Sequence, residues 1–304
     1  MIKRTLFFGN PAYLSLKNAQ LVIRLNDAQA QQEVTKTIPI EDIGVVVLED
    51  RQITVTNGAL DALLQNNCAV ITCDERHMPA GMLLPLVGHT VQSERFRQQI
   101  EASLPLKKQL WQQTVQAKIR NQASVLKRLS GAETGCMLAW ANDVKSGDSD
   151  NLEGRAAAYY WKSVFPKMER FVRDREGDAP NNLLNYGYAI VRAVIARALV
   201  ASGLLPTFGI HHHNRYNAYC LADDVMEPYR PYVDELVIKI LRSGADCSEM
   251  TTDLKRQLLG LPVAEVVING QRSPLMNAAT QTTASLCKCF AGELRKVAYP
   301  TMEI

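Results

Sequence analysis

Residues Asn181-Asn-Leu-Leu-Asn-Tyr-Gly-Tyr-Ala-Ile-Val-Arg-Ala-Val-Ile-Ala-Arg-Ala-Leu-Val-Ala-Ser202 form a stretch that has helical periodicity and is apolar on almost every side. Only Arg192 and Arg197 interrupt its second half. A helix that is apolar nearly all round is buried. We therefore expect a central core helix around which other helices pack. No run of eighteen or more apolar residues occurs, so we expect no membrane-spanning segment.

Helical periodicity continues on both sides of this stretch, from about residue 90 to the end of the chain. A polar loop with Pro and Gly, Arg173 to Asn181, precedes the core helix. The other expected helices are Val91 to Ala102, Lys107 to Leu129, Glu133 to Val144, Leu152 to Phe165, Asp223 to Ser243, Thr251 to Leu259 and Ser273 to Glu293.

The first eighty or so residues have a different pattern, that of short strands. Leu21, Ile23 and Leu25 alternate with Val22, Arg24 and Asn26, a pattern typical of a half-buried strand. The expected strands are Thr5 to Phe8, Tyr13 to Leu16, Ala19 to Leu25, Thr35 to Ile40, Val45 to Leu48 and Cys68 to Cys73, with one short helix over Asn57 to Asn66. The sequence predicts an α+β protein of two domains: a small β-rich domain over 1–87 and a larger all-α domain over 88–304.

Composition limits the class of protein. The 304 residues are 47% hydrophobic and 21% charged, with a net charge of +3, as in an ordinary globular protein. The seven cysteines do not form paired metal-binding motifs, and the N-terminus does not have the pattern of a secretory signal. We therefore expect reduced thiols and a cytoplasmic location.

One expected helix is basic. The run from Ser103 to Ala132 contains no acidic residue, although the whole chain is close to neutral. Such a surface favours binding to the phosphates of nucleic acid, whereas the alternative is a solvated face that neighbouring acidic groups neutralise. The basic candidates in this run are Lys107, Lys108, Lys118, Arg120, Lys127 and Arg128.

A histidine and carboxylate cluster follows the core helix. Three consecutive histidines, His211 to His213, precede Asp223, Asp224 and Glu227. Adjacent histidines cannot all reach one ion, and Asp223 has the alternative role of a helix N-cap. Carboxylates with one imidazole favour Mg²⁺ or Mn²⁺ over structural zinc. Such an ion near a basic helix points to phosphodiester chemistry.

Two further residues complete the candidate site. Glu153 opens the helix-like run Glu-Gly-Arg-Ala-Ala-Ala-Tyr-Tyr-Trp, where a glutamate can simply favour the helix dipole. Arg230 follows the acidic cluster between Pro228 and Pro231. Arg230 would bind the reacting phosphate or pair with Asp224 or Glu227.

These residues carry a resemblance to a known family. Asn151-Leu-Glu-Gly-Arg-Ala-Ala-Ala-Tyr-Tyr160, Asn182-Leu-Leu-Asn-Tyr-Gly-Tyr188 and Gly209-Ile-His-His212 leading to Asp224-Val-Met-Glu-Pro-Tyr-Arg-Pro231 resemble, in order, segments of the CRISPR-associated integrase family Cas-one. The resemblance covers nearly the whole chain and is most like the type II version, found beside Cas-nine. It implies a metal site made by Glu153, His212 and Glu227, with Asp224 supporting the site without binding the ion.

The resemblance also implies an activity and an assembly. A 3′-hydroxyl of a foreign DNA fragment attacks a phosphodiester of the CRISPR repeat in a transesterification that depends on Mg²⁺ or Mn²⁺, and the same site would cut branched DNA. The β-rich domain would form a homodimer, which would join a Cas-two dimer and double-stranded DNA, and Cas-nine and an accessory adaptation protein are further candidate partners.

Three other functions remain open on the residues alone. The same groups with water as nucleophile would make a stand-alone metal-dependent nuclease acting on branched DNA in repair. A non-catalytic DNA-binding scaffold with a degenerate site is the second alternative, and a zinc-binding regulator is the third. The presence of all three implied ligands disfavours the scaffold, and the lack of cysteines paired with the histidines disfavours the regulator.

Overall fold

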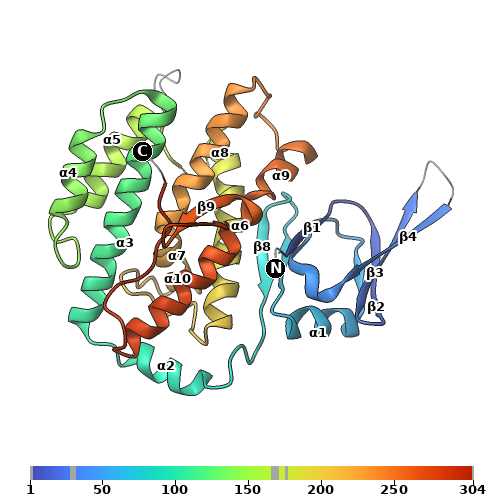
Figure 1. Cartoon of the computed structure of the whole chain (residues 1–304). Coiled ribbons are helices and arrows are strands. Elements are labelled where there is room, and N and C mark those ends of the chain that lie inside the picture. Colours follow the sequence, from blue (N-terminus) through green and yellow to red (C-terminus); the bar gives the residue numbers. More distant parts are fainter. Residues whose placement is uncertain (1–2, 28–31, 166–170, 175–176, 303–304) are drawn as a thin grey trace. The chain divides into compact units, whose positions relative to one another are not determined.

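The computed structural model describes residues 3–27, 32–165, 171–174 and 177–302. The chain divides into two compact units, residues 1–88 and 89–304, which are treated separately below (Figure 1). The first unit is rich in strands and the second in helices, so the protein belongs to the mixed α+β class.

The first unit contains two four-stranded sheets. One has the order β1-β5-β7-β8 and the other β4-β3-β2-β6. Strands β1, β5 and β7 run parallel, whereas β2, β3 and β4 form an antiparallel meander. The elements are β1 (Arg4–Phe8), β2 (Ala12–Lys17), β3 (Gln20–Asp27), β4 (Gln32–Pro39), η1 (Ile40–Asp42), β5 (Ile43–Leu48), β6 (Thr54–Val55), α1 (Asn57–Gln65), β7 (Ala69–Cys73) and β8 (Pro79–Leu83).

One apolar core holds this unit together. Leu14, Leu21 and Ile23 from the meander pack in the same cluster as Val46 from the parallel sheet and Leu63 from α1. The alternation expected in β3 holds in part: Leu21 and Ile23 are buried and Leu25 packs against the core, but Val22 is buried as well. The six expected strands are present, and β6 and β8 are additional.

The second unit is built from helices that follow the expected ranges to within a few residues, apart from the break described below. They are α2 (Gln92–Ile100), α3 (Leu104–Val125), η2 (Leu126–Ser130), α4 (Gly135–Asp143), α5 (Leu152–Val164), α6 (Asn181–Ala201), α7 (Cys220–Met226), η3 (Glu227–Tyr229), α8 (Arg230–Arg242), α9 (Thr252–Leu258), η4 (Leu261–Val263) and α10 (Leu275–Phe290).

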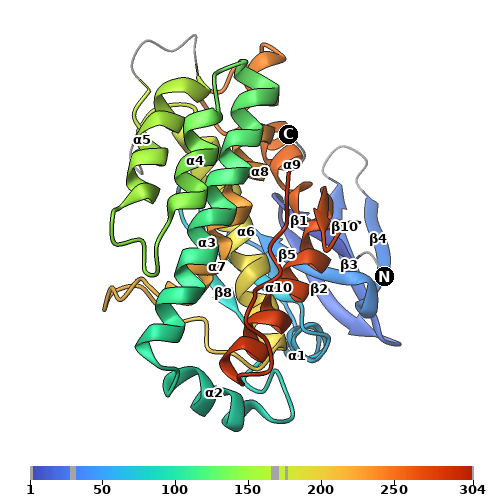
Figure 2. The same cartoon turned by 60° about the vertical axis from the view of Figure 1, so that its left-hand side comes forward.

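Helix α6 occupies the centre of this unit, as the sequence predicts. It contacts α7, α8, α9 and α10, and α3 runs beside α4 and α5 along the unit (Figure 2). By length and composition α6 is apolar enough to cross a membrane, but 83% of its most apolar window is buried inside the protein. Burial among other helices explains its composition without a membrane.

The all-α prediction for this unit is wrong in one place. Strands β9 (Glu265–Ile268) and β10 (Gln271–Pro274) form an antiparallel hairpin. Asn269 and Gly270 make the turn with φ of 52° and 73°, values that suit a two-residue hairpin loop. The Asn-Gly pair between two short runs was the sequence signal for this hairpin.

A second difference concerns the expected helix over 223–243. Helix α7 ends at Met226, a 3₁₀ turn follows, and α8 begins at Arg230. Pro228 has no backbone N–H to continue an α-helix, which accounts for the break. Asp223 lies inside α7 rather than at its N-cap, which is Tyr219.

Candidate active site

Lys118 on α3 lies between two carboxylates that are far apart in the sequence. Its Nζ is 2.6 Å from Glu153 Oε1 on α5 and 2.6 Å from Glu227 Oε2 in the break between α7 and α8. The lysine side chain is only 11% exposed. Two of the three residues that the resemblance implies as ligands therefore meet at one point.

The start of α5 fixes Glu153. Asn151 caps the helix through its side chain, which accepts a hydrogen bond from Gly154 N at 3.2 Å. Asp148 accepts the backbone N–H groups of Leu152 and Glu153 at 2.9 and 3.0 Å. These bonds satisfy N–H groups that a helix start leaves unpaired, and they hold Glu153 in the first turn, facing Lys118.

The helix break fixes Glu227. Asn121, one turn after Lys118 on α3, donates its side-chain N–H to the carbonyl of Pro228 at 2.8 Å. Arg230 then donates its Nε–H to Glu227 Oε1 at 2.9 Å. Of the roles considered for Arg230, the structure shows the pairing with Glu227.

His212 is oriented by Asp224, which is completely buried. Its Nδ1 hydrogen-bonds Asp224 Oδ1, and the backbone N–H groups of His211 and His212 also donate to that carboxylate, the former at 2.9 Å. A Cβ at position 209 would lie 2.7 Å from Asp224 Oδ2, so this approach requires Gly209. A carboxylate on one ring nitrogen fixes the imidazole as in many metal sites, where the other nitrogen binds the ion.

The indole of Trp111 packs against both His211 and His212. It stacks on His211 with ring centroids 4.2 Å apart and lies edge-on to His212 at 5.5 Å. Trp111 and Lys118 are seven residues apart on α3 and therefore share one face. A single helix face thus positions the histidines and contacts both carboxylates.

The charges in this cluster shift the pKa of its members. Burial alone would raise the pKa of Glu227, but Arg230 and Lys118 outweigh burial and lower it to about 2. The hydrogen bond to Asp224 raises the pKa of His212, whereas burial lowers that of His211. Glu153 and Glu227 also act on His212, so the three groups share one electrostatic environment.

A further buried acid, Asp234, lies on the Tyr188 side of Arg230. Asp234 accepts the hydroxyls of Tyr160 at 2.9 Å and Tyr188 at 2.5 Å. Arg230 lies over the ring of Tyr188, 4.7 Å from its centroid. Burial raises the pKa of Asp234 to about 6 despite these two donors. Tyr188, fixed by Asp234, therefore restrains Arg230, and Arg230 in turn restrains Glu227.

Whether these residues suit a metal ion depends on Lys118. In the described part of the chain, no group of three or more His, Cys, Asp or Glu side chains is arranged to hold an ion. The ammonium of Lys118 lies between Glu153 and Glu227, and His212 turns toward Asp224. However, the two carboxylates converge on one cation, the ammonium of Lys118, at 2.6 Å from each. The donor set fits a hard divalent cation.

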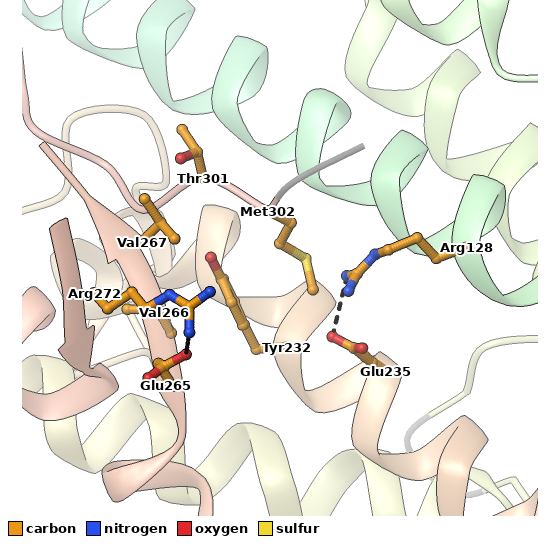
Figure 3. A pocket seen from close by; sticks show the side chains of 9 residues that line it. All are labelled: Arg128, Tyr232, Glu235, Glu265, Val266, Val267, Arg272, Thr301 and Met302. Carbon is orange, nitrogen blue, oxygen red and sulfur yellow. Dashed lines mark hydrogen bonds and ion pairs between the residues drawn. The ribbon is translucent and has the colours of Figure 1, made fainter. Parts of the chain in front are cut away.

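The basic candidates do not form one surface. Lys118 points into the acidic pair, Arg120 donates to Asn142 Oδ1 at 2.9 Å, and Arg128 pairs with Glu235 at 3.2 Å. In Figure 3, Arg128 and Glu235 pair on one side of a hollow, and Val266 and Arg272 line the opposite side. Lys118, buried and paired with two carboxylates, is therefore not part of an exposed basic surface for DNA.

Lys107, in contrast, lines a groove that also contains His212. The exposed loop after α6 supplies most of the other walls. The lining residues include Lys107, Phe208, His212, His213, Asn214, Arg215 and Asn217. Basic and polar groups in a groove beside the candidate ligand suit a nucleic-acid backbone. Lys108 and Lys127 are exposed elsewhere on α3 and η2.

Sequence reasoning missed the parts played by Trp111, Asn121 and Asp234. The first two share a face of α3 with Lys118, and this spacing was visible in the sequence. What they contact was not, because the partners come from segments 35 to more than 100 residues away.

The family model for CRISPR associated protein Cas1 matches residues 6–259. A CRISPR-associated endonuclease Cas1 of Neisseria meningitidis is 37% identical over 291 residues, which cover 94% of this chain and 91% of the relative. A CRISPR-associated endonuclease Cas1 of Saccharolobus solfataricus is 30% identical and covers 77% of this chain and 73% of its own length.

Solved structures have the same fold. A casposase bound to integration product has a TM-score of 0.79 at 20% identity, covering 98% of this chain and 92% of that one. A Cas1 protein from Thermotoga maritima has a TM-score of 0.72 at 14% identity, covering 99% of this chain and 100% of that one. A Cas6-RT-Cas1–Cas2 complex has a TM-score of 0.73 at 20% identity, and the match covers 96% of this chain and 35% of that one. With the family model and the Neisseria relative matching most of its length, the chain belongs to the Cas1 family.

Proposed function

We propose that this protein is a DNA integrase and endonuclease of CRISPR adaptation, which joins the 3′-hydroxyl ends of foreign DNA fragments to the repeat by transesterification. The observation that carries this proposal is the convergence of Glu153 and Glu227 on the ammonium of Lys118. His212, which Asp224 orients, lies beside them. The Cas1 relatives and the casposase bound to integration product support the same chemistry.

Glu153, His212 and Glu227 are the residues we assign to the catalytic metal site. Asp224 would keep the imidazole of His212 in one orientation and tautomer. Arg230 would hold Glu227 by its Oε1 atom, leaving Oε2 directed at the site. Bound Mg²⁺ or Mn²⁺ would supply Lewis-acid polarisation of a phosphoryl oxygen.

The groove lined by Lys107, His212 and Arg215 is the proposed path of double-stranded DNA next to the site. The positive charges would contact phosphates without reading sequence. Lys108, Lys127 and the remaining exposed charge of Arg120 would extend the contact. Arg230 would mainly position Glu227, because its Nε–H already donates to that carboxylate, and a phosphate contact would be its lesser role.

We further propose an assembly. The first unit would be the dimerisation domain and the second the catalytic domain, and the homodimer would bind a Cas2 dimer, as the Cas1–Cas2 complex among the similar structures suggests. All seven cysteines are free thiols, which suits the cytoplasm. Association with Cas-nine and an accessory adaptation protein, and the type II assignment, stay predictions.

The test is strand joining. The purified protein is mixed with Cas2, Mn²⁺ or Mg²⁺, a short duplex with free 3′ ends and a repeat-containing plasmid. Wild type should join the duplex to the plasmid, and His212→Ala, Glu153→Gln and Glu227→Gln should each remove joining. Lys145→Met, which changes an exposed lysine paired with Asp150, is the matched control and should join normally.

Cleavage of branched DNA without any joining would replace the integrase by a stand-alone nuclease. Binding of DNA with neither reaction, unchanged by Glu153→Gln, would favour the non-catalytic scaffold.

A further inference from the structure

Lys118 makes a contact that a surface lysine does not make. Its ammonium lies 2.6 Å from an oxygen of Glu153 and 2.6 Å from an oxygen of Glu227. Its side chain is 11% exposed, and those of the two glutamates are 23% and 7% exposed. The three charges therefore interact where solvent screens them weakly.

The ammonium and a divalent ion compete for the same atoms. Mg²⁺ and Mn²⁺ bind carboxylate oxygens, and Mg²⁺ requires distances of about 2.0–2.1 Å in a nearly octahedral arrangement. An ammonium at ion-pair distance from both Glu153 Oε1 and Glu227 Oε2 occupies the position that such an ion would take. The two cations also repel each other strongly at short distance.

We propose that Lys118 is a built-in competing cation, which holds Glu153 and Glu227 together when no divalent ion is bound and leaves at least one of them when an ion binds. This inference rests on the proposed metal-dependent function. Lys118 is thus a positioning residue that weakens ion binding while it keeps the two ligands converged. No other described lysine or arginine has an ion pair to both carboxylates.

The exchange also changes the charge presented to DNA. Lys118 and Arg230 balance the charges of Glu153 and Glu227 in the protein as it stands. A divalent ion adds two positive charges to this balanced group, and the displaced ammonium remains tethered beside it by a four-carbon stem. Phosphates would therefore bind better after the ion than before it.

Calorimetric titration of Mn²⁺ into the full chain tests the proposal without any catalytic turnover. Lys118→Met keeps the length of the side chain and removes its charge, and it should lower the Kd for Mn²⁺ roughly tenfold, which corresponds to about 1.4 kcal/mol. Lys145→Met removes an exposed lysine outside the proposed site and outside the proposed DNA contact, and it should leave the Kd unchanged. An unchanged or higher Kd for Lys118→Met would overturn the proposal.

A second measurement uses only the wild-type protein, in case Lys118→Met does not fold. Brief labelling with an amine-reactive reagent, read by mass spectrometry, should modify Lys118 slowly in chelator and several-fold faster with saturating Mn²⁺. Lys127 should react equally under both conditions. Equal reactivity of Lys118 with and without Mn²⁺ would contradict displacement.

Glu153→Gln separates failure of this inference from failure of the proposed function. If wild type binds Mn²⁺ and Glu153→Gln does not, the metal site stands, and the behaviour of Lys118→Met alone decides the role of the lysine. If wild type shows no Mn²⁺ binding that depends on Glu153, the proposed metal site and the competing role of Lys118 both fall.

Discussion

The indole ring of Trp111 lies parallel to the imidazole of His211, with 4.2 Å between their centroids and 2° between their planes. Trp111 is buried on α3, whereas His211 begins the exposed loop segment that carries His212. A rigid helix therefore supports a loop that needs a fixed backbone, because His211 and His212 both donate to Asp224.

Substitution of Trp111 should separate support of the loop from folding. Trp111→Phe keeps an aromatic face, and we expect strand joining within a few-fold of wild type. Trp111→Leu removes the stacking partner and part of a buried side chain, so joining should fall much further, with a loss of stability of about 3 kcal/mol or less. Urea unfolding and joining rates measure the two effects. Equal joining by the two variants would show that stacking does not position the histidines.

Asp224→Asn should weaken ion binding although Asp224 is not an assigned ligand. The hydrogen bond from this carboxylate raises the pKa of His212, so the neutral amide should let that pKa fall toward its ordinary value. The ring also loses its fixed orientation, for which losses of about 10–100-fold in metal affinity are typical. Mn²⁺ calorimetry and an NMR titration of His212 provide the measurements. An unchanged affinity together with an unchanged pKa would contradict this role.

Arg230 and Glu227 should be coupled in stability. Loss of one partner of a buried ion pair costs about 3–5 kcal/mol, but Lys118 remains beside Glu227 and should reduce the cost. We expect Arg230→Met to lower the free energy of unfolding by about 1–3 kcal/mol. Combined with Glu227→Gln it should cost less than the sum of the single changes. Additive effects in urea unfolding would exclude the coupling.

Asp234 should make stability depend on pH. Its pKa is raised from 3.8 to about 6, so its protonated form is favoured in the folded state. Its contribution is therefore complete below about pH 4 and is lost as the pH rises through 6, by up to about 3 kcal/mol. Asp234→Asn does not titrate, so the stability difference between wild type and this variant should change in favour of the variant from pH 4 to pH 7. A constant difference would contradict the raised pKa.

Lys107 should contribute to DNA affinity through charge alone. Lys107→Met should weaken binding to different DNA sequences to a similar degree and reduce the slope of log K against log salt by about 0.9. Lys145→Met, in which an exposed lysine already paired with Asp150 is lost, should change the slope much less. Fluorescence anisotropy at several salt concentrations measures both. Sequence-dependent losses would indicate base contacts instead.

The sequence alone determined the classes of the elements, because hydrophobic period and turn residues are local properties. It predicted the core helix α6, the strand around Leu21 and Ile23, and the order of the candidate motifs. It did not predict the hairpin at Asn269 and Gly270, whose strands are too short for a strong period. It also extended a helix across Pro228, where a missing N–H ends the α-helical pattern.

The tertiary structure decided what the charged residues do. In the sequence, Lys118 is one of six basic residues in a run and Glu153 is one glutamate at a helix start, 74 positions from Glu227. Only the packing of α3 against α5 and the α7–α8 break brings the three together at 2.6 Å. Local pattern fixes which face of a helix a residue occupies, but its partner depends on contacts between distant segments, and the energy of a charge depends on that partner and on burial.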